Sequence, residues 1–196
     1  LLAIAYLIFI WRPLYEVTTR VQQSRQAAST GQYDRAHALL SAASEADPLS
    51  PEAPGMDGRL YLQQAREAPA AAPAPLEAAV RCFRTAIERD PADYKNHERA
   101  GDVATLAGWY SEAYEWYEKA ARRYPGSGRL QLRLAQTAEQ LGRTDVALSH
   151  YRRAVEIEDA FRRQFEEMYP EREQVVSRLG QENYEMARRR IAELSR

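Results

Sequence analysis

The chain has 196 residues, of which 45% are hydrophobic and 28% charged, and this composition excludes a largely disordered protein and a polytopic membrane protein. Its formal net charge of -1 excludes the dense basic surface that a dedicated nucleic-acid-binding protein needs. A single cysteine, Cys82, excludes an internal disulfide and a cysteine-built zinc site. Only Lys95 and Lys119 of the 27 basic residues are lysine, a bias typical of a GC-rich bacterial genome.

The chain opens with an uncharged run, LLAIAYLIFIW, which is followed at once by Arg12 and Pro13. A membrane-spanning helix needs about 20 apolar residues, so we predict that residues 1–16 are the end of a transmembrane helix. Residues 1–15 would make the membrane contact. The alternative is a hydrophobic helix that docks on the rest of the chain.

The charges that follow this run predict an orientation. Arg12, Arg20 and Arg25 are opposed only by Glu16, and an excess of basic residues favours the cytoplasmic side of a membrane. We therefore expect a membrane-associated protein whose remaining residues are cytoplasmic.

From residue 17 onward the strongest signal is internal repetition with a period of 34 residues. Each repeat carries an alanine, a bulky residue four positions later and a second alanine after three more. The first alanines are Ala36, Ala79, Ala113 and Ala147; the bulky residues are Leu40, Phe83, Tyr117 and Tyr151; the second alanines are Ala43, Ala86, Ala120 and Ala154. Prolines follow at 48, 91 and 125, whereas Asp159 stands at the fourth position. Small residues upstream are Ser24, Gly58, Gly101 and Ala135, and Gly31, Gly108 and Gly142 mark turns.

This pattern resembles the tetratricopeptide repeat (TPR) family, in which small residues and an aromatic recur on paired helices that end at a proline. The resemblance implies an all-α, TPR-type helical solenoid of about four helix-hairpin repeats with a C-terminal capping helix. The four predicted units within residues 17–161 are 17–50, 51–93, 94–127 and 128–161. No unit buries its apolar face alone, so the core would come from stacking neighbours.

Three local departures from the repeat have structural consequences. The second unit is nine residues too long, and we expect the Ala/Pro-rich stretch 68–76 to form an extended loop. Where Asp159 replaces proline, the helix is expected to continue to Pro170. Residues 162–196 should then supply this extension and a capping helix over about 171–194, with Val176, Leu179, Met186 and Ile191 on its apolar face.

A search for chemistry finds no catalytic, cofactor or metal site. His37, His97 and His150 are far apart in the sequence and are expected to be polar surface or groove residues. Cys82 has no helical histidine partner and is expected to be a structural thiol. Phosphate-binding glycine loops and nucleophile motifs are absent. We therefore expect no enzyme activity and no cofactor, and no small-molecule substrate or nucleic acid as a partner.

The resemblance implies a protein-interaction scaffold with a concave groove, and the apolar start adds the expectation that this scaffold is membrane-tethered. The family's ligand-facing positions, carried over to this chain, are Arg25, Arg59, Lys95, Arg99, Asp102, Arg129, Arg133 and Gln136. Their excess of basic residues favours an acidic peptide or a C-terminal carboxylate. The lysine and asparagine of chaperone-binding relatives are replaced by Val21 and Arg25, which argues against a chaperone-tail receptor. The alternative is that these arginines only pair with Glu52, Glu98 and Glu139.

A second functional hypothesis comes from the abrupt apolar start. The chain is similar in architecture to the C-terminal TPR tail of a polytopic membrane enzyme such as an O-antigen ligase or polymerase-like protein. The catalytic residues of such an enzyme would lie outside this sequence. This chain would still be non-catalytic, although its parent protein would not be.

Overall fold

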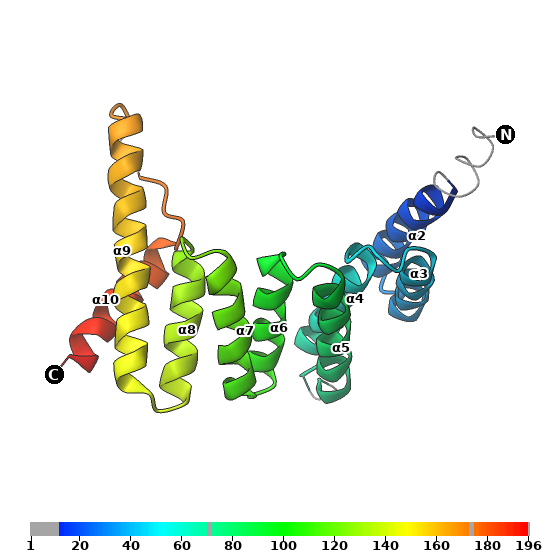
Figure 1. Ribbon diagram of the computed structural model, residues 1–196, viewed down its shortest axis with the longest axis horizontal. Helices are drawn as coiled ribbons and strands as arrows, with labels where there is room; N and C mark the ends of the chain where they lie inside the picture. Colours follow the sequence, from blue (N-terminus) through cyan, green and yellow to red (C-terminus); the bar gives the residue numbers. More distant parts are fainter. Residues whose placement is uncertain (1–11, 70–71, 173–174, 196) are drawn as a thin grey trace. The chain divides into compact units, whose positions relative to one another are not determined.

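A computed structural model describes residues 12–69, 72–172 and 175–195 of the chain. All the longer elements in these ranges are α-helices, so the expected all-α stack of helix hairpins is confirmed (Figure 1). In chain order the elements are α2 (Arg12–Ser29), α3 (Tyr33–Ala46), α4 (Glu52–Glu67), α5 (Pro73–Arg89), α6 (Tyr94–Leu106), α7 (Tyr110–Arg123), α8 (Gly128–Gln140), α9 (Thr144–Met168) and α10 (Gln181–Leu194).

The chain divides into two compact units, the first ending at Ala107 and the second beginning at Gly108. In the first unit each of the helices α2 to α5 packs against the next one along the chain, up to α6. In the second unit α7 packs on α8, α8 on α9 and α9 on α10. The division falls between α6 and α7, inside the third predicted repeat.

The repeated small and bulky residues form the core of both units. All eight repeat alanines have an exposed fraction of 0%: Ala36, Ala43, Ala79, Ala86, Ala113, Ala120, Ala147 and Ala154. The bulky residues between them, Leu40, Phe83, Tyr117 and Tyr151, are also fully buried. Alanine allows two helices to approach closely, and the larger side chain fills the space beside the contact. The 34-residue pattern therefore predicts the core correctly.

Glycines with left-handed backbone close the turns inside the hairpins. Gly31 and Gly142 have φ of 75° and 69°, a region that residues with a Cβ rarely adopt. After Gly31 the amide of Gln32 donates to the carbonyl of Ala27 (2.9 Å), and after Gly142 the amide of Arg143 donates to Ala138 (2.9 Å). This pattern satisfies carbonyls that the helix end leaves without a partner.

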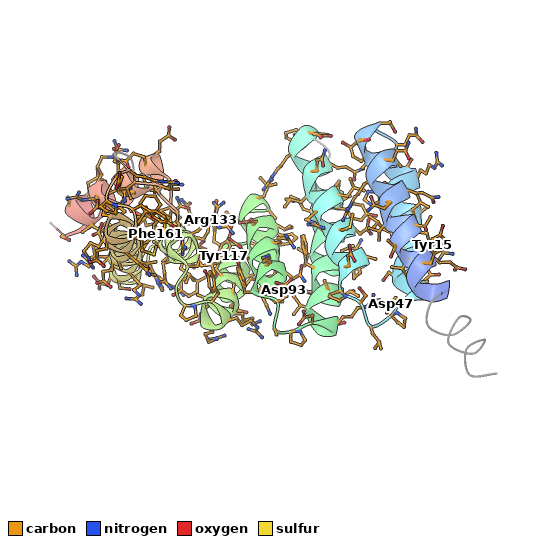
Figure 2. The ribbon with its side chains drawn as sticks, turned by 90° about the horizontal axis from the view of Figure 1, so that it is seen from above. Tyr15, Asp47, Asp93, Tyr117, Arg133 and Phe161 are labelled. Atoms are coloured by element: carbon orange, nitrogen blue, oxygen red, sulfur yellow. The ribbon has the colours of Figure 1, made fainter. Side chains whose placement is uncertain are left out.

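Each second helix ends two residues before a proline. The helices α3, α5 and α7 stop at residues 46, 89 and 123, ahead of prolines 48, 91 and 125, because the residue before a proline avoids helical backbone. Aspartates shape the connections that follow in the first unit. The side chain of Asp47 accepts from the amides of Leu49 and Ser50 (both 3.1 Å), and Asp93 caps α6 by accepting from the Lys95 amide (2.9 Å) (Figure 2).

The loop formed by the Ala/Pro-rich stretch is shorter than expected. Helix α5 already begins at Pro73, so the prediction of an extended loop over 68–76 is wrong for its last four residues. A proline is tolerated in the first helical turn because the amide hydrogen it lacks would have no partner there. Residues 70–71 lie outside the described ranges.

The second unit ends in an extended helix and a cap. Helix α9 continues past Asp159 to Met168, as expected, and projects beyond α8 (Figure 1). Helix α10 packs on α9, with Leu179 and Ala187 buried against the α8–α9 hairpin. The last helix therefore covers the α8–α9 hairpin.

The start of the capping helix differs from the prediction. The helix begins at Gln181 rather than near residue 171. Val176 therefore lies before the helix and is exposed, instead of belonging to its apolar face. The buried carboxylate of Glu158 explains the difference, because it accepts from the Leu179 amide (3.0 Å) and from the Ser177 hydroxyl (2.6 Å). These bonds hold a turn, and Gly180 with φ of 86° lets the helix start only after it.

The predicted transmembrane segment falls mostly outside the structure. Residues 1–11 are not among the described residues, and residues 12–16 belong to α2, continuous with the first predicted repeat. None of the helices built from the described residues combines the length and apolar composition of a membrane span.

Candidate functional site

The predicted groove residues lie on the first helix of each pair. Arg25 is on α2 and Arg59 on α4, while α6 carries Lys95, Arg99 and Asp102. Spacings of four and three residues place the last three on one face of α6. Arg129, Arg133 and Gln136 share a face of α8 by the same spacing, in the second unit (Figure 2 labels Arg133).

Three arginines from different helices of the first unit form a positive cluster. Partial burial of the Arg59 guanidinium, together with the charges of Arg99 and Arg25, lowers the pKa of Arg59. Glu52 opposes this effect without cancelling it. Within the described residues Arg59 forms no ion pair. The positive charges of Arg25 and Arg99 therefore both act on Arg59, and an anion placed beside Arg59 would relieve that repulsion.

The contacts that Arg25 and Arg99 make within the protein are weak enough to leave their guanidinium groups available to a ligand. Arg25 lies 3.7 Å from a carboxylate oxygen of Glu52, and half of each side chain is exposed, 52% and 56%. Such a solvated pair contributes about 1 kcal/mol or less. Arg99 donates to the side-chain oxygen of Asn96 (3.2 Å), its neighbour on α6. The expected pairing with Glu52 therefore exists for Arg25, but it is weak.

A cavity of about 350 Å³ opens beside this cluster, between α2 and α4. Its apolar lining comes from all three helices of this corner: Ala28 of α2, Leu40 of α3, and Met56 and Leu60 of α4. Arg25 and Arg59 also line it, and a guanidinium nitrogen of Arg25 lies 3.7 Å from the sulfur of Met56.

The sequence reasoning missed the apolar part of this cavity. Met56 and Leu60 are three residues before and one after Arg59 on α4, so all three lie on neighbouring parts of one helix surface. That spacing could have identified them. The contribution of Leu40 could not be foreseen, because it comes from the second helix of the first pair and depends on how the helices pack.

The predicted residues of the second unit are placed differently. Arg129 is exposed, whereas Arg133 and Gln136 are half-buried on α8. Arg129 and Arg133 each already interact with other groups of the protein. The last glutamate considered as a partner, Glu139, pairs with Arg190 of α10 instead. We therefore centre the candidate site on the first unit.

A second polar cluster lies where α3, α4 and α5 meet. The Nδ1 atom of His37 is 2.5 Å from Asp57, its Nε2 atom is 3.2 Å from the side-chain oxygen of Gln64, and its ring stacks on Tyr61 at 3.8 Å. Burial lowers the pKa of His37, but the hydrogen bond and charge of Asp57 outweigh it, and the net pKa is raised. This histidine therefore joins two helix pairs.

The thiol of Cys82 belongs to the same cluster and is inert. It donates to the second carboxylate oxygen of Asp57 (3.4 Å). Burial, followed by the negative charge of Asp57, raises the pKa of Cys82 to about 12. A thiol with this pKa stays protonated near neutral pH and is a poor nucleophile, which agrees with the structural role expected for it.

The other two histidines are less exposed than predicted. His150 bridges three helices of the second unit, 3.0 Å from the hydroxyl of Tyr114 and 2.8 Å from Gln131, and burial lowers its pKa. His97 is 2% exposed, so the expectation of a surface or groove residue is wrong for it. Among the described residues no group of three or more His, Cys, Asp or Glu side chains is arranged so that it could hold a metal ion.

Comparisons with known proteins agree with this architecture. A family model described as tetratricopeptide repeat matches residues 21–82, 76–128 and 117–162. No curated protein matches the chain. Nothing in the comparisons supports membrane attachment or a relation to O-antigen ligases.

Solved structures with the same fold share little sequence with the chain. A MamA structure (MSR-1, C2) is 22% identical over 74% of this chain and 78% of its own, with a TM-score of 0.60. Another crystal structure of MamA is 14% identical, covers 91% of this chain and 90% of its own, and has a TM-score of 0.64. The first TPR of Spaghetti (RPAP3), bound to the HSP90 peptide SRMEEVD, is 17% identical over 65% of this chain and 94% of its own, with a TM-score of 0.56. At these identities the likeness shows the fold alone.

Proposed function

We propose that this chain binds a peptide, because it belongs to the tetratricopeptide repeat family. The family is a protein-interaction scaffold and is typically non-catalytic. Members present the first helix of each pair to their ligand, and in this chain those helices carry the arginine cluster. The partner we propose is an acidic peptide segment or a C-terminal carboxylate, bound to the first unit.

The observation that carries this proposal is the position of Arg59, which lines a cavity with Arg25 and is acted on by the charges of both Arg25 and Arg99. Such a group of guanidinium side chains gains most from a ligand with several carboxylates, because each carboxylate can accept two parallel N–H bonds. Lys95, exposed one turn before Arg99 on α6, adds a further cation to the same helix face.

The peptide complex of Spaghetti supports the chemical class of the ligand. That protein is bound to a peptide ending in Glu-Glu-Val-Asp, which is acidic and short. Our chain has Val21 and Arg25 where chaperone-binding relatives carry lysine and asparagine, so we propose a different acidic partner rather than a chaperone tail.

Membrane tethering remains a separate proposal. Its support is the uncharged run of residues 1–11 and the basic residues that follow it. The alternative of a TPR tail on a polytopic membrane enzyme rests on the same run. The tether and the enzyme-tail hypothesis both concern where the protein is located. Neither changes the proposal that the first unit binds a peptide.

The binding proposal is tested with an array of labelled acidic heptapeptides that have a free carboxyl terminus. A matched array carries Asn and Gln in place of the acids and a terminal amide. We expect wild-type protein to bind members of the acidic array only, and more weakly as salt is added, because exposed charges are screened. The Arg59→Glu, Arg99→Glu double variant should lose at least about tenfold in affinity.

A control variant separates local from overall charge. Arg35→Glu, Arg81→Glu makes the same change in net charge at exposed positions of α3 and α5, outside the cluster. We expect its affinities to equal those of wild type. If both double variants, still folded by circular dichroism, bind like wild type, the arginine cluster is not the binding site. Equal losses in both would mean that overall charge is responsible.

A further inference from the structure

The cavity between α2 and α4 combines apolar side chains with positive charge. Its floor is apolar and is lined by Ala28, Leu40, Met56 and Leu60. Its remaining walls include the guanidinium groups of the positive cluster through Arg25 and Arg59, and the polar side chains of Ser24 and Gln63. A purely anionic ligand would use the cations but would make no use of the apolar floor.

The cavity is large enough for an aromatic side chain. Benzene fills an apolar cavity of about 150 Å³ in a protein, and this cavity measures about 350 Å³. A ring with the adjoining main chain of a peptide therefore fits in it. The volume also lies at the lower end of the range of about 300–1,000 Å³ found for ligand pockets.

The chemistry of the walls selects an aromatic ring over an aliphatic side chain. A guanidinium above a ring face is attracted by the negative face of the π system, and Arg25 and Arg59 both line the cavity. The sulfur of Met56, 3.7 Å from Arg25, supplies a further favourable contact at a ring edge. An aliphatic side chain would gain the apolar floor but neither of these interactions.

We propose that this cavity receives an aromatic side chain of the acidic segment, with carboxylates of the same segment on the arginine cluster. The inference rests on the proposed function, because it adds a side-chain specificity to the same site. It defines the partner chemically as a segment in which Phe, Tyr or Trp stands within a few residues of two or more acids.

The experiment compares four residues at each position of the acidic heptapeptide array. Each position in turn carries phenylalanine, cyclohexylalanine, leucine or alanine, while the acids are kept. At the position that reaches the cavity we expect phenylalanine to improve affinity about tenfold over alanine, from ring burial and cation contacts. Cyclohexylalanine has the same bulk without a π system, and we expect it to bind about threefold more weakly than phenylalanine.

Filling the cavity should remove this preference without removing acidic binding. Ala28→Leu places extra carbon atoms in the cavity, and Met56→Phe fills it from the opposite helix in case the first variant does not fold. Ala38→Leu, at an exposed position of α3, makes the same change outside the cavity. We expect the filled variants to bind phenylalanine and alanine peptides equally, at the affinity that wild type has for the alanine peptide, and Ala38→Leu to behave as wild type.

The outcomes separate this inference from the function on which it rests. If acidic peptides bind through Arg59 and Arg99 but phenylalanine gives no advantage at any position, the aromatic specificity is wrong and the proposed function stands. Equal affinity for phenylalanine, cyclohexylalanine and leucine would mean an apolar pocket without ring selection. Failure of every acidic peptide to bind wild-type protein would overturn both.

Discussion

At the scale of single residues, two histidines on second helices of their repeats have pKa values shifted in opposite directions. His37 lies against the carboxylate of Asp57 with Asp34 also near, and its pKa is raised. His150 lies between Tyr114 and Gln131, and burial lowers its pKa more than the charge of Glu118 raises it. The groups around each ring decide the direction of its pKa shift.

This contrast predicts two histidine titrations on opposite sides of the ordinary value of about 6.5. In an NMR titration of the imidazole resonances we expect His37 to titrate above that value and His150 below it. The variants His37→Gln and His150→Gln assign the signals. Two midpoints on the same side of the ordinary value would contradict the arrangement of Asp57 around His37.

The same shift has a defined effect on stability. Because the folded pKa of His37 is raised, its stabilising contribution is full below the unfolded value and is lost as pH rises through the folded value. Thermal midpoints of wild type should therefore fall more between pH 5.5 and 8.5 than those of His37→Gln. Asp34, Asp57, Tyr61 and Cys82 are the titratable groups around this ring, and all remain in the variant, so the difference between the two profiles reports His37.

At the scale of helices, each pair is set by contacts between a small residue and a large one. In the pair formed by α4 and α5, a Cβ atom at Gly58 would lie 2.9 Å from the ring of Phe83. That ring is fully buried and cannot move away. The glycine is therefore required by the approach of the helices, although glycine by itself disfavours a helix.

Gly58→Ala is expected to destabilise the protein by about 1–3 kcal/mol, because overpacking against Phe83 exceeds the gain in helix propensity. Gly126→Ala is the matched control, since nothing lies within 4 Å of the added carbon there. Urea unfolding measures both. A Gly58→Ala variant as stable as wild type would show that α4 and α5 can separate at no cost, contrary to the packing described.

At the scale of the whole molecule, helix α10 covers apolar surface of the second unit. The apolar residues of the α8–α9 hairpin pack against α10 and the preceding turn, which bury them. The buried Glu158 anchors that turn and also pairs with Arg162 on its own helix. A stack of this kind needs such a cap because each unit contacts only its neighbours.

Replacing Leu179 with aspartate places a charge against this apolar surface, which is costly. We expect the thermal midpoint to fall by at least about 5 °C, with binding of a hydrophobic dye. Val176→Asp makes a similar change three residues earlier, where the side chain is 55% exposed, and should leave the midpoint almost unchanged. Equal midpoints for both variants would mean that the cap does not stabilise the second unit.

The sequence by itself determined the helical repeat and its core, because a period of 34 with small and bulky residues at constant offsets has one simple packing solution. It also determined where helices end, since prolines and left-handed glycines act through local backbone geometry. Each of these rests on neighbours along the chain, and the structure confirms them.

Only the tertiary structure decided what depends on distance across helices. The cap begins at Gln181 rather than near 171 because Glu158, more than twenty residues earlier, binds the Leu179 amide. The charge of His37 depends on Asp57 of another helix. Arg25, Arg59 and Arg99 were named from a repeat position, but the effect of Arg25 and Arg99 on Arg59 and the apolar cavity beside them arise from the packing of α2, α3, α4 and α6. Sequence spacing specifies a face of one helix, whereas a site needs the distance between faces of several.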